Sequence, residues 1–295
     1  MKSVIIIGNG FDIDLGLKTS FSEFINSYEF KTLADIPLIK YIRKKHDDNL
    51  SWCDIEGAFR EALYPNSEGF KDVDINFAWQ SITIAWEGHI KNITQKEVVS
   101  INRDSCAYTL LSQTESTSNW FSFNYTSPFY LSGLGEDNQQ FVHNSFVPKE
   151  LNIFNEIQII QKNLIIGVDS NIPECVRNNE KLSPIIKQNN YYYNDTCLIQ
   201  ALFNADNIII YGHALGITDS DYFKPFFDNI LNGSLQTKTI YIITDKESSF
   251  EKIKANLKTY NIDYDILIKR ATIVPIYTMN GPNDKMFRYI IDLMK

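Results

Sequence analysis

Cysteine is scarce and dispersed in this chain of 295 residues. Cys53, Cys106, Cys175 and Cys197 stand singly, without any C-x-x-C pair, so the sequence indicates neither a zinc knuckle nor a disulfide framework, and no metal is predicted. Basic residues are fewer than acidic ones: 28 Lys and Arg against 36 Asp and Glu give a net charge of −8. This balance argues against a broad surface for nucleic acid or anionic lipid.

Long apolar runs are also absent. The first run, Val4–Ile7, is too short for a secretory signal and no cleavage pattern follows it. No later run approaches the roughly 18 apolar residues that a membrane span requires. We therefore expect a cytoplasmic protein that has no membrane partner. The 44% hydrophobic and 22% charged residues indicate a folded globular chain rather than a disordered one.

Short β-branched runs recur along the chain and are typical of strands buried on both faces, as in a parallel sheet between helices. In the C-terminal third they alternate with helices expected from about Ser220 and from about Glu247, as in βαβ units. The pattern predicts an α/β fold with a Rossmann-like, mostly parallel sheet. The expected strands are Val4–Ile7, Trp120–Phe123, Phe141–His143, Leu164–Val168, Asn207–Tyr211, Thr239–Thr244 and Thr272–Ile276.

About 110 residues separate the first two runs and contain no convincing strand. Helical spacing is present there instead, at Trp79, Ile82, Trp86, Ile90 and Ile93. We interpret this stretch as a large helical insertion whose tryptophans pack a bundle. The resulting division is a nucleotide-binding core of residues 1–18 and 119–295 and an inserted helical cap of residues 19–118. The tyrosines 191–193 and the asparagines around positions 178 and 189 are interpreted as loop borders, either plain or lining a site.

The sharpest local pattern is Gly8-Asn9-Gly10-Phe11-Asp12, directly after the first expected strand, with Gly16 four residues later. Glycines at a strand end let the backbone approach a phosphate, and a helix that begins there directs N–H groups at the anion. The spacing is not G-x-G-x-x-G, because Ile13 occupies the place of the third glycine. A nucleotide loop and a purely structural turn are both open.

Polar residues end two further strands. Asn124 follows Trp120–Phe123, and His143 ends Phe141–His143. Ligands of open α/β sheets bind at the carboxyl ends of the strands, so these side chains are candidates for contact with a substrate. A structural role for a lone histidine is the alternative.

The segment Gly212-His213-Ala214-Leu215-Gly216 superficially resembles the nucleophile elbow of α/β hydrolases. Alanine stands in the place of the nucleophile, which excludes acyl transfer through this element. His213 and Asp219 are candidates for a ribose contact. A turn followed by an acidic helix N-cap is the alternative.

The opening Ile6–Asp12, with Gly16, Leu17 and Thr19, resembles the start of the AbiH family of bacterial anti-phage abortive-infection proteins. Later segments resemble the successive motifs of that family in the same order along the whole chain. The resemblance implies an anti-phage effector. These segments are Trp52–Glu56, Phe123–Thr126, His143, and Gly212–Leu215 with Asp219 and Tyr222–Phe223.

The same landmarks are similar, at longer range, to those of sirtuins. Asn124 stands where sirtuins have the asparagine of T-Q-N-I-D, His143 where they have the histidine of H-G, and Gly212–Leu215 resembles their G-T-S-L loop. The resemblance implies a sirtuin-like core that handles NAD as substrate or ligand. The first sirtuin loop, G-A-G-x-S with another glycine four residues on, is matched by Gly8, Gly10, Asp12 and Gly16.

This chain departs from the sirtuin pattern in three places and lacks the sirtuin zinc module. Asp12 replaces a serine, Lys18 a proline and Asn144 a glycine. The paired C-x-x-C ligands of the zinc module, a structural part of the sirtuin protein deacylases, are missing from this sequence. Hydrolysis of NAD at the bond between nicotinamide and ribose is therefore the simpler activity that the resemblance implies.

Roles follow from this reading as expectations. Asn124 orients the ribose or the attacking water, and His143, with an ordinary pKa of about 6.5, accepts a proton near neutral pH. Backbone N–H groups of Gly8, Asn9 and Gly10 approach the pyrophosphate, with Phe11, Gly16 and Tyr125 in the same site. Asp12, Asp54 and Glu56 bond a ribose hydroxyl or the carboxamide, or else serve capping and packing.

Two function classes stay open at this point. One is an effector that depletes NAD after infection is sensed, and the other is a nucleotide-binding switch without turnover. An effector that kills its host must be silent until triggered, which favours control by self-assembly or by a partner protein of the defence system. The sequence shows neither surface, and the helical cap is a candidate by position alone.

Overall fold

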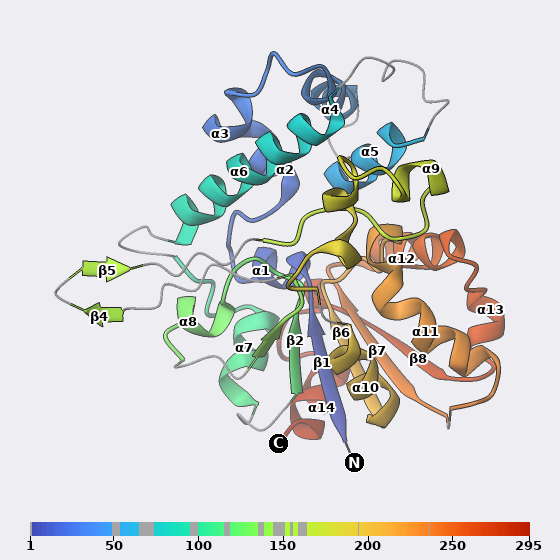
Figure 1. The fold of residues 1–295 in the computed structure, drawn as a ribbon. Coiled ribbons are helices and arrows are strands. Elements are labelled where there is room, and N and C mark those ends of the chain that lie inside the picture. Colours follow the sequence, from blue (N-terminus) through green and yellow to red (C-terminus); the bar gives the residue numbers. More distant parts are fainter. Residues whose placement is uncertain are drawn as a thin grey trace.

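A six-stranded sheet lies at the centre of the computed structural model (Figure 1), with the order β3-β2-β1-β6-β7-β8 and all neighbours parallel. Its strands are β1 (Ser3–Ile7), β2 (Asn119–Ser122), β3 (Gln139–Phe141), β6 (Asn207–Tyr211), β7 (Thr239–Thr244) and β8 (Thr272–Tyr277). The structure describes residues 2–48, 54–64, 74–94, 100–114, 119–134, 139–143, 151–153, 156–158, 164–193, 195–235 and 237–295.

Helices cover both faces of this sheet because successive strand residues point to opposite sides. Val4 and Ile6 of β1 face one hydrophobic core, while Ile5 and Ile7 face the other. On the first face lie α10 (Thr196–Asn204), α11 (Ser220–Leu231), α12 (Glu247–Thr259) and α13 (Tyr264–Leu267). On the second face lie α1 (Asn9–Asp14), α7 (Cys106–Gln113), α8 (Pro128–Leu131) and α14 (Lys285–Leu293).

A third hydrophobic core lies beyond the carboxyl ends of the strands, above the sheet in Figure 1. The buried Trp86 of α6 (Ile75–Thr94) lies at ring-contact distance from Phe21, Phe24 and Tyr125, the last of which follows β2. Helices inserted after β1 therefore pack on one another and reach down to the sheet. They are α2 (Phe21–Asn26), α3 (Tyr28–Lys31), α4 (Pro37–Asp48), α5 (Ile55–Ala62) and α6 (Ile75–Thr94).

The segment Leu164–Val168 corrects a prediction, because it is extended but does not join the sheet. Its backbone bonds mainly to groups outside the sheet: the indole of Trp79 donates to the Ile166 carbonyl (2.9 Å), and the Tyr125 hydroxyl donates to that of Ile165 (3.2 Å). The N–H of Ile165 donates to the carbonyl of His143, just after β3 (2.9 Å). Val168 makes only an isolated bridge with Ile186. The run packs with the inserted helices, and burial there requires the same apolar residues as burial in a strand.

The other expected strands are confirmed within a few residues, as are the helices that begin at Ser220 and Glu247 and the helical insertion after β1. The third strand ends at Phe141 rather than at His143, although the N–H of Val142 still donates to the Ser122 carbonyl. The α/β fold is therefore as predicted, and the sheet, which was expected to be mostly parallel, is parallel throughout its six strands.

Packing groups two segments differently from the expected domain division. Helix α7, inside the stretch assigned to the cap, packs on the sheet. Residues 164–186, assigned to the core, pack with α2–α6. Short elements complete the described chain: the antiparallel pair β4 (Leu151–Ile153) and β5 (Glu156–Gln158), α9 (Glu174–Arg177), and the 3-10 turns η1 (Ser183–Ile185), η2 (Lys187–Asn189), η3 (Ile217–Asp219) and η4 (Thr278–Asn280).

Two glycine loops lie against each other where β1 and β6 end. The N–H of Gly8 donates to the Tyr211 carbonyl (2.9 Å) and the N–H of Gly10 donates to that of Gly212 (2.8 Å). Gly212 has a φ of 64°, and a Cβ there would stand 2.3 Å from the backbone nitrogen of Phe11. These glycines therefore allow two backbones to approach closely, which holds the residues after both strands in fixed positions.

Replacement of Gly212 by alanine is expected to lower the free energy of unfolding by about 3 kcal/mol or more, since the new methyl group meets backbone and the left-handed conformation is costly. The matched control is Gly216→Ala in the same loop, where φ is −71° and the nearest atom to a new Cβ is 4.0 Å away. The control is expected to change stability by less than about 0.5 kcal/mol. Urea denaturation measures both, and equal losses would contradict the close-approach role.

Candidate functional site

A buried cluster of charged and polar side chains lies where the sheet meets the inserted helices. Its centre is Asp219, at the start of α11, whose carboxylate oxygens lie 2.7 Å from Lys187 Nζ, 3.2 Å from His143 Nε2 and 3.4 Å from His213 Nε2. Asp219 occupies a helix N-cap position, yet its side chain makes no capping hydrogen bond. The carboxylate therefore serves the cluster rather than the helix.

Lys187 connects this centre to the inserted helices. Its ammonium, 1% exposed, donates to Asp219 and to Glu56 Oε2 (2.9 Å). Glu56 in α5 also accepts from the Thr218 hydroxyl (3.1 Å) and from the N–H of Gly167 (3.0 Å). One buried cation thus joins two carboxylates from segments that are far apart in the sequence.

Backbone pairing places Lys187 at this point. The N–H of Lys187 donates to the Val168 carbonyl, and the N–H of Val168 donates to that of Ile185, each at 2.9 Å. Gly167 permits this approach, because a Cβ there would stand 2.1 Å from the Ile185 oxygen.

His213 is held by an unusual turn. The N–H of Leu215 donates to its Nδ1 (3.0 Å), so Nε2 carries the proton and faces Asp219. Leu215 has a φ of 49°, which is uncommon for a residue other than glycine. Such strain often marks functional sites.

Burial and the single cation set the protonation states. Burial disfavours the charged form of Asp219, but Lys187 and His143 hold its pKa well below the ordinary value. Burial and the nearby ammonium lower the pKa of His143 to about 4, so the imidazole is neutral at neutral pH. Burial raises the pKa of Glu56 to about 7, with Lys187 opposing the rise. His143 is therefore a weaker base than its ordinary pKa of 6.5 led us to expect.

A second hydrogen-bonded group adjoins the first and is centred on Asp12 of α1. Its two carboxyl oxygens accept from Asn124 Nδ2 (2.7 Å) and from the Thr126 hydroxyl (2.5 Å). Asn124 Oδ1 is buried and has no hydrogen-bond partner within the described part of the chain. Phe123 and Tyr125, the two sequence neighbours of Asn124, contact the ring of His143 with their own rings, and these contacts join the two groups.

The structure brings together five of the expected site residues from distant parts of the chain, and Glu56 joins them through Lys187. Those five are Asp12, Asn124, His143, His213 and Asp219. Tyr125 lies at the border of the cluster. Asp54 instead caps α5, because its carboxylate accepts from the N–H of Gly57 (2.7 Å).

The glycine loop after β1 differs from the expected phosphate cradle. The N–H groups of Gly8 and Gly10 donate to protein carbonyls, as does that of Phe11 (to Gly8, 2.8 Å), so these three do not offer donors to a pyrophosphate. The Phe11 ring is buried in the core against Trp120 and Tyr211. Asn9 is exposed and accepts from Thr19, and Gly16 ends α1 beside Asn102. The other positions named from the sequence, Trp52, Cys53 and Asn144, lie outside the described residues. Cys106 and Cys175 are free thiols.

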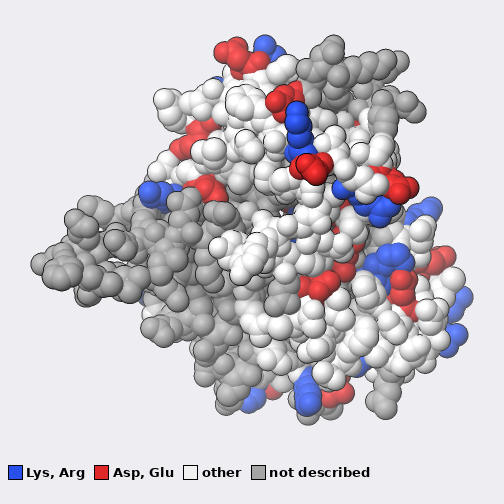
Figure 2. All heavy atoms as spheres, viewed as in Figure 1, with Lys and Arg blue, Asp and Glu red and all other residues white. Residues whose placement is uncertain are grey.

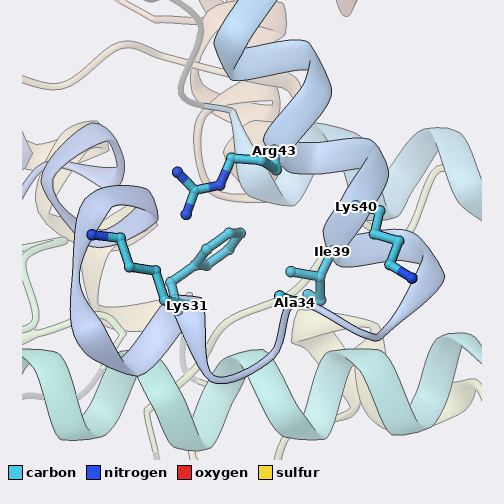
Figure 3. A pocket seen from close by; sticks show the side chains of 6 residues that line it. Lys31, Ala34, Ile39, Lys40 and Arg43 are labelled. Carbon is cyan, nitrogen blue, oxygen red and sulfur yellow. The ribbon is translucent and has the colours of Figure 1, made fainter.

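Two surface hollows lie away from the cluster. One, of about 110 Å³, lies between α3 and α4, flanked by Lys31, Lys40 and Arg43 (Figure 3). The other, of about 230 Å³, is bordered by Trp79 and the expected loop tyrosines Tyr191 and Tyr192. Figure 2 shows acidic and basic side chains interspersed on the face it presents, without a broad patch of one sign.

The protein-family comparison gives a match over most of the chain. Residues 4–241 match the model described as bacteriophage abortive infection AbiH. The chain belongs to the AbiH family. It is therefore an anti-phage abortive-infection protein, and every residue of the cluster lies within the matched part. No curated protein matches the chain. Among the residues that the structure describes, none of the helices has the length and apolar character needed to cross a bilayer.

Removal of the buried cation is expected to be costly. Lys187→Met leaves Glu56 and Asp219 facing each other without compensation, so we expect a loss of about 3–5 kcal/mol in the free energy of unfolding at pH 8. The loss should shrink toward pH 5 as the carboxylates take up protons. The exposed Lys181→Met is the control. Chemical denaturation at both pH values tests this, and unchanged stability at pH 8 would refute the arrangement.

The Asp12 carboxyl is expected to lower stability as the pH rises. Burial raises its pKa from 3.8 to about 7, while hydrogen bonds from Thr126 and Asn124 oppose the rise. The unfolded chain therefore releases this proton near pH 4 and the folded chain near pH 7, so stability falls between these values and not beyond. Asp12→Asn removes the titration and should be more stable than the natural chain at pH 8, by up to about 4 kcal/mol. The difference should shrink toward pH 4; a difference independent of pH would contradict the assignment.

Proposed function

We propose that this AbiH protein hydrolyses NAD at the bond between nicotinamide and ribose. The observation that carries the proposal is the buried group of Asn124, His143 and Asp219 at the carboxyl ends of the strands. The strand order is the one in which dinucleotides bind at that edge of the sheet. Abortive infection, the role of the family, is consistent with depletion of an essential nucleotide.

The chemistry requires a held ribose, a positioned water and an acceptor for one proton. In the proposed reaction, the water oxygen attacks C1′ as the C–N bond breaks, and neutral nicotinamide leaves with the bonding electron pair. The reacting carbon passes through an oxocarbenium-like state, so even a weak base suffices to take the proton from water. The neutral His143 takes that proton, and the ionised Asp219 beside it, 3.2 Å away, stabilises the imidazolium.

The proposal also limits how the nucleotide binds. The N–H groups of Gly8 and Gly10 are already bonded, so other groups must hold the diphosphate. Asn124 and His143 are 3% and 4% exposed, which means that part of the protein around them must move for the ribose to enter. That requirement fits an effector held inactive until a trigger, whether self-assembly or a partner protein of the defence system, opens it.

The test is incubation of the purified full chain with NAD, with and without lysate of phage-infected cells, followed by chromatography of free nicotinamide. We expect release that falls by about 10²- to 10⁴-fold in His143→Ala and in Asn124→Ala, as is typical when an acid–base or positioning group is lost. His89→Ala is the matched control, because His89 is a buried histidine of α6 that contacts Lys18 and Glu29 instead of the cluster.

The outcomes separate the two function classes. Release that persists in the folded His143→Ala variant would refute the assigned base. A rise in melting temperature with NAD but no nicotinamide under any condition would refute hydrolysis and establish a nucleotide-binding switch.

A further inference from the structure

We propose that Asp12 is a positioning residue that orients the side-chain amide of Asn124, so that its carbonyl oxygen rather than its NH₂ group faces the substrate. The inference rests on the proposed function for the identity of that substrate. It assigns to Asp12 no contact with the nucleotide, in contrast to the ribose or carboxamide contact expected from the sequence.

Both carboxyl oxygens of Asp12 are already used within the protein. Oδ1 accepts from Asn124 Nδ2 at 2.7 Å, and Oδ2 accepts from the Thr126 hydroxyl at 2.5 Å. Asp12 is 1% exposed. A carboxyl with both oxygens bonded and no access to solvent acts on its neighbours rather than on a ligand.

The chemical asymmetry of these partners fixes the amide. The two ends of an asparagine amide have nearly the same shape, so packing alone selects neither orientation. An ionised carboxylate only accepts hydrogen bonds, and only the NH₂ end of Asn124 donates. Asp12 therefore draws Nδ2 toward itself and turns Oδ1 away. The N–H of Asn124 donates to Ser122 Oγ (3.2 Å), which anchors its backbone.

The atom turned away is the one without a partner. Asn124 Oδ1 is buried and accepts no hydrogen bond from any residue that the structure describes. A buried acceptor left unbonded costs about 1–3 kcal/mol, so a ligand that supplies a donor there is favoured. A ribose hydroxyl and the attacking water are such donors, while a phosphate oxygen is not.

The orientation should respond to pH. Burial raises the pKa of Asp12 to about 7, and the groups that act on it, the amide of Asn124 and the hydroxyls of Thr126 and Thr19, are all neutral. Protonated Asp12 gains a donor and can bond to Oδ1, which permits the flipped amide. Above this pKa only one orientation is hydrogen-bonded.

The test follows the Asn124 side-chain amide directly, by ¹⁵N NMR of full-length protein labelled at asparagine and without any ligand. The resonance is assigned by its loss in Asn124→Ala. We expect it to shift between pH 5.5 and 8.5 with a midpoint near 7, and to lose this titration in Asp12→Asn. The control is Asp14→Asn in the same helix, which should retain the titration because Asp14 bonds Tyr211 and Ala107 instead.

An amide resonance that does not titrate in the natural chain, or that titrates equally in Asp12→Asn, would overturn the inference. A second readout uses turnover: Asp12→Asn should lower kcat by about 10- to 100-fold with little change in KM. If the natural chain releases no nicotinamide, the proposed function fails while the ligand-free amide titration still decides whether Asp12 orients Asn124.

Discussion

The site depends on the interactions of the Lys187 ammonium with two buried carboxylates. The ammonium lies 1% exposed between Asp219, at the start of α11, and Glu56 of the inserted helices. Its charge favours an ionised Asp219 and a neutral His143, because it lowers the pKa of both side chains. Because a buried charge needs its partners, the same contact holds the inserted helices against the strand ends. Position, protonation and closure of the site are therefore coupled through one side chain.

The fold was largely predictable because buried parallel strands require β-branched runs, and these runs are visible without a structure. Leu164–Val168 was the exception: its carbonyls are satisfied by Trp79 and Tyr125, side chains distant in sequence. An apolar run reports burial and not the partner of its backbone. The resemblance of the motifs to those of sirtuins leads us to expect a bound nucleotide. The structure itself establishes the parallel sheet and its strand order.

The site residues that directly follow a strand could be predicted from the sequence, whereas Lys187, which lies outside the sheet, could not. Asn124, His143 and His213 stand at strand ends, so parallel topology alone brings them to one edge. Lys187 belongs to no motif and is placed in the cluster by the pairing of residues 168 and 186, which no pattern in the sequence predicts. The glycines after β1 were ambiguous for a physical reason, because approach to a phosphate and approach to another backbone both require a residue without a Cβ. In the structure, Gly8 and Gly10 allow the approach of another backbone.

The cluster carries an imbalance that bears on regulation. Asn124 Oδ1 is buried without a partner among the residues that the structure describes, whereas both oxygens of Asp12 are bonded. A protein tolerates such an orphaned acceptor when another requirement fixes it, and here Asp12 fixes it. On the proposed function, the hydrogen bond that a ribose hydroxyl supplies at Oδ1 would offset part of the cost of separating Lys187 from Glu56 or Asp219 on opening of the site. Ligand binding and opening would in that case be linked, since an entering ribose supplies a bond that the closed protein lacks.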